Sequence, residues 1–507
     1  MFAKVRSFGF FGISSFEVEV EVDASRGLPS FNIVGLPDTA IKESKDRIRS
    51  AMRASSIKFP VLSIMVNLAP ADTKKSGSVH DMAILVAILK ATNIIMGNTD
   101  DSAFVGEVSL NGKIRHINGV LAMVLKAYES GVKNIFVPKE NAFEASVVEG
   151  INVYGVESVE ELINHLCDVK YINVQERYIP PKTEYNEILD FSDVKGQYSA
   201  KFALEIAAAG GHNVMMIGSP GSGKSMLAKR MPTILPPLSF QESLETTNIH
   251  SIAGLLDKNT PIITKRPFRS PHHTISSAGL TGGGTVPHPG EISLAHNGVL
   301  FLDEFAEFEK HTIETIRQPI EDGYVTISRV SGTVIYPCSV MLIGAMNPCP
   351  CGYYGHPTRK CVCPQKKVRA YLSKLSGPII DRFDLHVDVA PVNFDDMSST
   401  EKGESSEKIR ERIMRARKIQ LERFKGTNIK CNAQIPASVI QKYCIMDDSA
   451  FQKLKQVFEK MNFSGRSYNK ILKVSRTIAD LENSELITKR HISQAVQFRS
   501  LDKKYWS

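Results

Sequence analysis

The stretch Gly218–Ser225 constrains this chain more than any other, because it matches the phosphate-loop pattern G-x-x-x-x-G-K-[S/T] at every fixed position. The apolar run 213–217 predicts a buried strand before the loop, and the helix formers of 226–230 predict a helix after it. Glycines let successive backbone N–H groups converge on phosphate, and the helix N-terminus adds a favourable dipole. A chance match by a Gly-rich turn is the alternative. The candidate nucleotide-binding residues are Gly218, Ser219, Pro220, Gly221, Ser222, Gly223, Lys224 and Ser225.

Specific chemical roles follow for two residues of this loop. We expect the Lys224 ammonium to neutralise the β- and γ-phosphates of ATP, and the Ser225 hydroxyl to ligate Mg²⁺. Downstream, Gly298–Phe305 has the sequence of a buried strand that ends in Asp303 and Glu304. Hydrolysis needs one acid to hold the Mg²⁺ shell and another to orient the attacking water. Asp303 suits the first role and Glu304 the second, and a solvated acidic strand end is the alternative.

Two more polar residues complete the predicted catalytic set. A third apolar strand sequence, Val340–Met346, is followed by Asn347, and a polar side chain at that edge of an open α/β sheet faces the ligand crevice. We therefore expect Asn347 to help position the hydrolytic water. Arg382 can neutralise transition-state charge when a neighbouring subunit supplies it, an effect of ~10³–10⁵ in rate. A surface salt bridge is the alternative role for Arg382.

Length and composition limit the class of protein. A chain of 507 residues is expected to hold roughly three or four domains. Its apolar content of 42% and charged content of 23% are ordinary for a globular protein. No apolar run is long enough to span a bilayer, and Met1–Phe8 lacks the features of a secretory signal, so the sequence predicts a cytoplasmic protein. The net charge of +8 permits an anionic partner but does not require one.

The first third of the chain predicts an α+β domain over residues 1–168. Its expected elements are strands at 16–22, 61–68 and 134–137, a helix over 38–54 capped by Asp38, and a hairpin of 104–110 with 113–115 around the turn Asn111-Gly112. Within it, Val105–Val120 and Ala127–Asn141 resemble the proteolytic domain of the Lon proteases. That family cleaves with a Ser–Lys dyad, but Val79 and Leu121 hold the matching positions here, and neither side chain can attack a carbonyl or carry a proton. The resemblance therefore implies a Lon-like fold that serves as a binding or ring-forming module. An active dyad built from neighbours that do not match remains the alternative; these are Ser76, Ser78 and Lys126.

The central motifs together resemble the AAA+ ATPases. An insert that includes Arg266–Ser276, and a predicted hairpin of Tyr324–Arg329 with Thr333–Pro337, resemble the Mg-chelatase and MCM-helicase branch of that superfamily. The resemblance implies that the hairpin points into the pore of a hexamer and grips DNA, so Arg329 near its tip is the DNA-binding candidate. A solvated hairpin charge is the alternative. His272 and His273 are expected to pack or hydrogen-bond in the insert and not to take part in catalysis.

Four of the eight cysteines lie within fifteen residues, which points to a metal site in a reducing compartment and not to disulfides. Thiolates in two close pairs suit tetrahedral Zn²⁺, although unligated thiols are the alternative. His356 in the intervening loop is a substitute ligand. The predicted zinc ligands are Cys349, Cys351, Cys361 and Cys363.

The C-terminal part predicts a helical lid. Lys408–Lys425 is rich in basic residues and has one apolar face, which favours a solvated lid helix over a phosphate-binding one. Ser464–Leu481 resembles the AAA+ lid helix that carries the sensor-2 arginine. Arg466 matches that position, and Arg476 is the weaker candidate.

The three parts in this order resemble the ComM/YifB family, often labelled Mg-chelatase-like proteins. The predicted fold class is a multidomain α/β protein: a Lon-like domain over 1–168, a linker over 169–190, an AAA+ core over 191–392 and a helical lid over 393–507. The resemblance implies a homo-hexameric ATPase, using ATP, Mg²⁺ and Zn²⁺, that acts as a helicase or translocase on single-stranded or branched DNA. In that family the proposed task is branch migration during natural transformation, alongside recombination proteins. A Mg-chelatase-type metal-insertion motor and an ATP-dependent protease are the alternatives.

Overall fold

The computed structural model describes residues 1–73, 75, 77–180, 189–257, 260–285, 287–329, 332–391, 403–461 and 463–506. Part of the predicted linker, 181–188, and part of the predicted break before the lid, 392–402, lie outside these residues. Two compact units are present: Met1–Lys182 with Phe240–Thr264, and Thr183–Ser239 with Lys265–Ser507. The sequence assigned all of 191–392 to one core, yet the segment 240–264 belongs to the first unit. Within the described residues no helix is long and apolar enough to cross a membrane.

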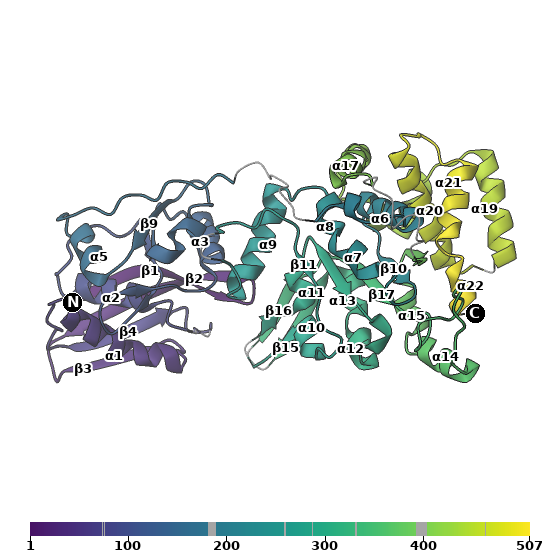
Figure 1. The fold of residues 1–507 in the computed structure, drawn as a ribbon. Helices are drawn as coiled ribbons and strands as arrows, with labels where there is room; N and C mark the ends of the chain where they lie inside the picture. Colours follow the sequence, from purple (N-terminus) through teal and green to yellow (C-terminus); the bar gives the residue numbers. More distant parts are fainter. Residues whose placement is uncertain are drawn as a thin grey trace. The chain divides into compact units, whose positions relative to one another are not determined.

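The first unit is built on a seven-stranded mixed sheet (Figure 1). Its spatial order is β3 (Ser30–Val34), β4 (Ser63–Ala69), β2 (Ser14–Ser25), β1 (Phe2–Phe11), β5 (Ser102–Phe104), β8 (Asn134–Pro138) and β9 (Asn152–Val156). β1 and β2 form an antiparallel hairpin, whereas β5, β8 and β9 continue from β1 in parallel. Sequence analysis located β2, β4 and β8 but did not identify β1, β3 or β9.

Helices of the first unit cover this sheet and complete its core. They are α1 (Thr39–Ala54), α2 (Asp81–Ala91), α3 (Val120–Glu129), α5 (Val159–Leu166) and α9 (Phe240–Ile252). The predicted cap of α1 is confirmed, because the Asp38 carboxylate accepts a hydrogen bond of 2.9 Å from the Ile41 amide. The predicted Asn111-Gly112 turn is also present, but its hairpin is short: β6 (Glu107–Val108) pairs with β7 (Ile114–Arg115), while Phe104 belongs to β5 of the large sheet.

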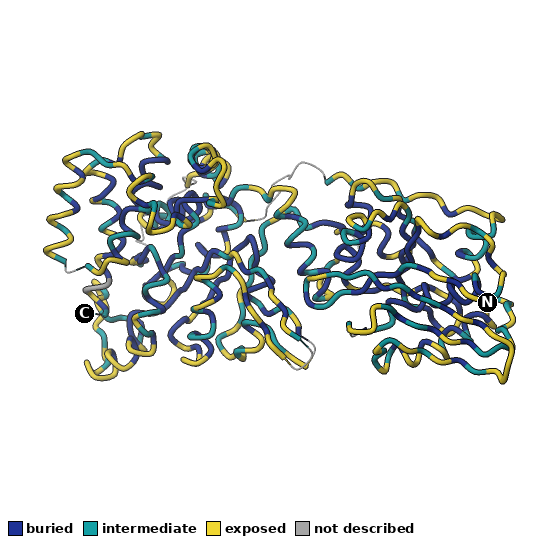
Figure 2. Tube along the Cα trace, turned by 180° about the vertical axis from the view of Figure 1, so that it is seen from behind, coloured by how far each residue is buried: buried dark blue, intermediate teal, exposed yellow. Residues whose placement is uncertain are grey.

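The second unit contains a five-stranded, fully parallel sheet in the order β11-β14-β17-β10-β18. The strands are β10 (Val214–Ile217), β11 (Phe268–Arg269), β14 (Val299–Leu302), β17 (Met341–Met346) and β18 (Leu385–Asp388). Every residue of β10, β14 and β17 is buried (Figure 2), as expected for strands covered by helices on both faces. Because these strands run in parallel, the residues that follow them gather at one edge of the sheet.

Two further elements of the second unit follow the sequence predictions. The hairpin consists of β15 (Tyr324–Arg329) and β16 (Gly332–Pro337), in which Arg329 stands opposite Gly332. Residues 330 and 331 at its tip lie outside the described part of the chain. The lid contains α17 (Ser406–Arg423), α19 (Asp448–Met461), α20 (Gly465–Leu481), α21 (Lys489–Gln497) and α22 (Leu501–Tyr505).

The basic side chains of α17 are largely committed to internal contacts. Arg412 forms ion pairs with Glu205 and Glu404, and Arg423 pairs with Asp480. Arg417 donates to the Ala208 carbonyl at 3.0 Å. These contacts attach α17 to α6 (Tyr198–Gly210) and to α20. They support a structural lid helix over a phosphate-binding one.

Candidate functional site

The phosphate loop follows β10, and two of its glycines adopt backbone angles that favour glycine. Gly221 has φ +76° and Gly223 has φ +93°, a region that strains residues with a Cβ. Helix α7 (Lys224–Lys229) begins directly afterwards, so the loop leads into a helix N-terminus as the motif predicts. The local sequence therefore produces the strand, loop and helix that a phosphate cradle requires.

The Lys224 ammonium lies at the centre of the site. It donates hydrogen bonds to the Gly218 carbonyl at 2.7 Å and the Ser219 carbonyl at 3.0 Å, and it contacts the Asn347 amide oxygen at 3.3 Å. Burial lowers the pKa of Lys224, and the Asp303 carboxylate opposes that shift. A buried ammonium that holds only neutral oxygens is well placed to exchange them for phosphate.

The predicted Mg²⁺ ligands are brought together as expected. The Ser225 hydroxyl donates to the Asp303 carboxylate at 2.6 Å, although the two residues are far apart in sequence. Hydroxyl and carboxylate oxygens are the hard ligands that Mg²⁺ prefers, and this ion usually keeps several waters as well. Ser225 at the start of α7 and Asp303 at the end of β14 can therefore hold the ion between them.

Glu304 is held in an unusual backbone conformation next to a histidine. Its φ is +50°, in the left-handed region that non-glycine residues rarely adopt, and its amide donates to the Asp303 carboxylate at 2.9 Å. The His273 Nδ1 lies 3.1 Å from the Glu304 carboxylate. A strained residue of this kind is typical of functional sites, where the surrounding fold keeps it in place.

His273 is the site residue that sequence analysis missed. The sequence placed His272 and His273 in an insert and expected packing or hydrogen bonding. The two rings pack in a tilted arrangement with centroids 4.1 Å apart, and the His272 Nδ1 forms a hydrogen bond with the Thr274 hydroxyl. His273, however, also lies against the predicted catalytic glutamate. The position of His273 in the chain could have indicated this contact. His273 follows shortly after β11, and β11 pairs with β14, the strand that leads to Glu304.

The two predicted arginines lie apart from these groups. Arg382 pairs with Glu321, and its side chain is only 10% exposed. It would have to leave that partner to reach a neighbouring subunit's phosphate. Arg466 begins α20 and is 59% exposed, 4.0 Å from Asp381. Its rival Arg476 is buried and bound to Asp480, so it serves the lid's core.

Arg329 lies at the end of β15 and is exposed. Its guanidinium donates to the Gly284 carbonyl at 3.2 Å and the Ser328 carbonyl at 3.1 Å. Among the described residues, no carboxylate pairs with it. The described part of the hairpin therefore presents an exposed guanidinium that contacts only backbone carbonyls there.

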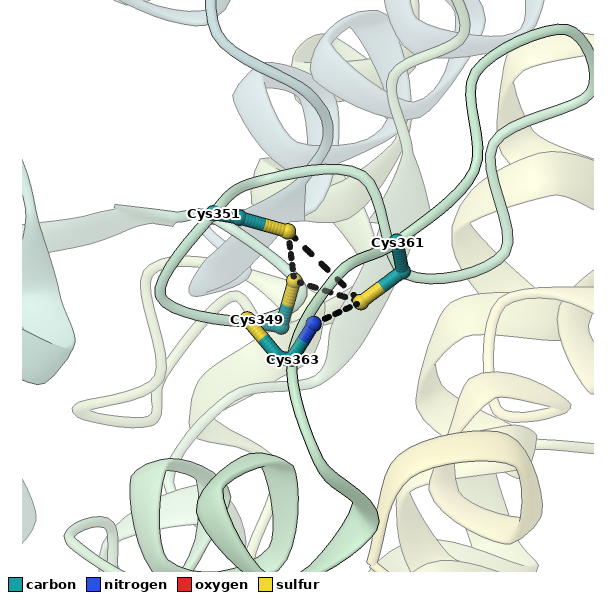
Figure 3. Close-up of side chains that lie close together, drawn as sticks. All are labelled: Cys349, Cys351, Cys361 and Cys363. Atoms are coloured by element: carbon teal, nitrogen blue, oxygen red, sulfur yellow. Dashed lines mark hydrogen bonds between the residues drawn. The ribbon is translucent and has the colours of Figure 1, made fainter.

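The four predicted cysteine ligands form one cluster (Figure 3). The sulfur of Cys349 lies 3.4 Å from that of Cys351 and 3.7 Å from that of Cys361, and Cys351 and Cys361 are 3.6 Å apart. All four sulfurs lie within 4.8 Å of one another. Four thiolates around tetrahedral zinc at ~2.3 Å would be roughly 3.8 Å apart, so the donor set fits that ion.

The substitute ligand His356 lies outside this cluster, because its Nδ1 accepts hydrogen bonds from the Thr358 and Arg359 amides. The cysteine loop instead touches the nucleotide loop. A Cβ added to Gly352 would lie 2.3 Å from the Pro220 Cδ, so glycine permits this close approach.

Val79 and Leu121, which hold the positions that match the Lon family's dyad, lie in the interior of the first unit. Leu121 is fully buried and Val79 nearly so, within one apolar cluster. The Ser78 hydroxyl donates to Glu107, and the Lys126 ammonium to Glu129. Ser76 lies outside the described residues. No described group therefore replaces the dyad at Val79 and Leu121.

Three family models match this chain. "Magnesium chelatase, subunit ChlI" covers residues 190–397, "Subunit ChlI of Mg-chelatase" covers 20–141, and "Magnesium chelatase, subunit ChlI C-terminal" covers 403–499. A Lon protease of Acinetobacter baumannii is 27% identical over 157 residues, which are 28% of this chain and 19% of that protein.

Two relatives match almost the whole chain. The uncharacterised protein YifB of Salmonella typhimurium is 39% identical over 497 residues, covering 97% of this chain and 96% of that protein. The competence protein ComM of Haemophilus influenzae is also 39% identical, over 502 residues, with the same two coverages. This chain therefore belongs to the YifB/ComM family of Mg-chelatase-type AAA+ proteins.

Proposed function

We propose that this chain hydrolyses ATP and uses the energy to move along DNA. The observation that carries the first half is the convergence of Lys224 with Asn347, Ser225 with Asp303, and His273 with Glu304. The first pair would neutralise phosphate charge, the second would bind Mg²⁺, and the third would hold an acid that orients water. Phosphoryl transfer needs these three parts.

The chemistry follows from these positions. ATP bound at the phosphate loop would replace the carbonyls in the contacts of Lys224. Ser225 and Asp303 would hold Mg²⁺, which would supply positive charge to neutralise the phosphates. Glu304 orients the attacking water and Asn347 contacts it from the next strand. Arg382 and Arg466 reach the γ-phosphate from a neighbouring subunit and from the lid, which requires a ring; we propose a homo-hexamer in the cytoplasm.

Three observations support DNA as the polymer along which this protein moves. One relative is named a competence protein, the chain has a net charge of +8, and β15 of the hairpin ends in the exposed Arg329, which pairs with no carboxylate among the described residues. We propose branch migration during recombination of incoming DNA, with recombination proteins as partners. The second candidate is a metal-insertion motor, favoured by the Mg-chelatase models; a porphyrin metallation assay with partner subunits would identify it.

The cysteine cluster is proposed to hold one structural Zn²⁺. Its residues would supply four thiolates and leave no open position, as in structural zinc sites. Because Gly352 packs on Pro220, the ion would fix the loop that borders the phosphate cradle.

Substitutions in the nucleotide site test the ATPase. Lys224→Ala removes the buried ammonium and is expected to abolish nucleotide binding or turnover. Glu304→Gln keeps the side-chain volume but cannot orient water as a carboxylate does, so it should bind ATP and lower kcat by ~10²-fold or more. Fluorescent-nucleotide binding and phosphate release measure both properties. Full turnover by either variant would remove the motor assignment.

A separate variant tests whether His273 positions Glu304. His273→Ala is expected to lower kcat by roughly tenfold with nucleotide affinity unchanged, because the carboxylate loses its partner. His273→Asn, which keeps a donor near the Nδ1 position, should restore much of the rate. His272→Ala is the matched control and should keep wild-type turnover. Equal losses in His272→Ala and His273→Ala would indicate a merely structural role.

Metal analysis tests the zinc proposal. Purified protein is expected to contain one equivalent of zinc per chain, and cobalt substituted for it should show thiolate charge-transfer absorption. Replacing Cys351 and Cys361 with serine should remove both signals, whereas Cys167→Ser, which lies outside the cluster, should keep them. A wild-type chain without metal, purified under reducing conditions with zinc present, would contradict the proposal.

DNA dependence tests the translocase. Single-stranded or branched DNA is expected to stimulate ATP hydrolysis, and Arg329→Ala should reduce that stimulation while basal turnover persists, because one phosphate contact is lost. Lys418→Ala, at an exposed cation of α17, is the comparison and should respond like wild type. ATP-driven branch migration on a three- or four-strand junction, with Lys224→Ala as control, tests the activity itself. An ATP hydrolysis rate that none of these DNA substrates changes would contradict the proposal.

A further inference from the structure

The segment Phe240–Thr264, which we call the excursion, leaves the second unit, joins the first and returns. Its helix α9 packs against α3 of the first unit (Figure 1). Leu244 of α9 lies against the apolar cluster that contains Val79 and Leu121. The excursion therefore docks where the matching positions of a protease dyad are filled by apolar side chains.

A buried polar contact fixes the docking. The Glu144 carboxylate accepts hydrogen bonds from the Ser251 hydroxyl, the Leu121 amide at 3.1 Å and the Asn141 amide at 3.2 Å. The Gly119 amide in turn donates to the Ser251 hydroxyl at 3.1 Å. Glu144 is only 7% exposed, so departure of Ser251 would leave a buried carboxylate with one donor fewer. Docked and undocked states are thus distinct arrangements, separated by the cost of that lost partner.

The base of the excursion is closed by a single side chain in the second unit. The Arg266 guanidinium donates to the Pro236 carbonyl at 2.6 Å, where the chain leaves, and also to the Pro237 carbonyl. The same group donates to the Asn297 carbonyl at 2.6 Å, just before β14. One arginine therefore joins the exit, the return and the root of the strand that carries Asp303 and Glu304.

Both ends of the excursion lead directly into the nucleotide site. The exit follows α7 and α8 (Met231–Ile234), the helices after the phosphate loop. The return runs through β11 to His273, which contacts Glu304. A movement of the phosphate loop would therefore shift the exit of the excursion, and a movement of Glu304 would shift its return.

We propose that the excursion couples the nucleotide state of the motor to the first unit, with the Glu144–Ser251 contact as its docking socket. On this proposal, the positions that match the protease dyad lie beneath the segment that transmits the nucleotide state. This inference rests on the proposed ATPase, because it needs nucleotide at the phosphate loop. It assigns the Lon-like unit a mechanical part in the motor cycle, without requiring any chemistry at Val79 or Leu121.

Hydrogen exchange of the full-length protein tests this coupling. The Gly119 amide reports directly on docking, because its acceptor is Ser251 of the excursion, and the Leu121 amide reports on Glu144, which accepts from Ser251. Adding a non-hydrolysable ATP analogue with Mg²⁺ is expected to slow exchange in peptides that cover 117–125 by about threefold or more, since ordering the phosphate loop stiffens the clamped segment. Fluorescent-nucleotide binding is measured on the same preparation.

Two variants separate coupling from simple stability. Leu244→Asp places a charge against the apolar cluster, so exchange in 117–125 should be faster and should no longer respond to nucleotide, while nucleotide affinity stays at the wild-type value. Gln241→Ala, at an exposed position of the same helix, should respond like wild type. Nucleotide that binds without changing exchange in wild type, or a response that persists in Leu244→Asp, would overturn the inference. Failure to bind nucleotide at all would instead remove the ATPase and, with it, the basis of the coupling.

Discussion

The buried ammonium of Lys224 is the charge around which the second unit is arranged. It is held by the carbonyls of Gly218 and Ser219 and by the Asn347 amide, all of them neutral oxygens. Burying a cation without a bound anion is costly, and the depressed pKa of Lys224 reflects that cost. A polyphosphate relieves it. The site is thus prepared for an anion, and the same group links the loop after β10 to the end of β17.

Motif residues and their partners differ in how far the sequence could predict them. The phosphate loop, Asp303, Glu304 and Asn347 were predictable because short strand sequences precede each of them and parallel strands bring their ends together. The pairing of Ser225 with Asp303 followed from that topology. His273 was not predictable in its role, because its contact depends on the conformation of a non-repetitive insert and on the strained backbone of Glu304.

The fold shows the same division. Asp38 and the Asn111-Gly112 turn act locally, so their sequence signals sufficed. The central strand β1 was not predicted, although β2 follows it directly in a hairpin; its place in the middle of the sheet depends on pairing with β5, which is distant in sequence. Chain order also misled: residues 240–264 follow the phosphate loop closely, yet they pack in the first unit. Contacts between segments that are distant in sequence do not change the local periodicity of either segment. The packing of the excursion against the first unit is such a contact.

The apolar residues at the positions that match the dyad and the proposed docking of the excursion have a common physical basis. An active serine and lysine need water, access for a substrate and polar neighbours. Val79 and Leu121 need the opposite, an apolar cover, and Leu244 of the excursion supplies part of it. Once the cover is in place, Glu144 is shielded from water and takes its donors from the covering segment. Among the described residues, the segment that covers these positions is the one that returns to the nucleotide site through β11. A role in proteolysis and the proposed role in transmission would therefore need the same surface, and the apolar side chains present there suit the second role.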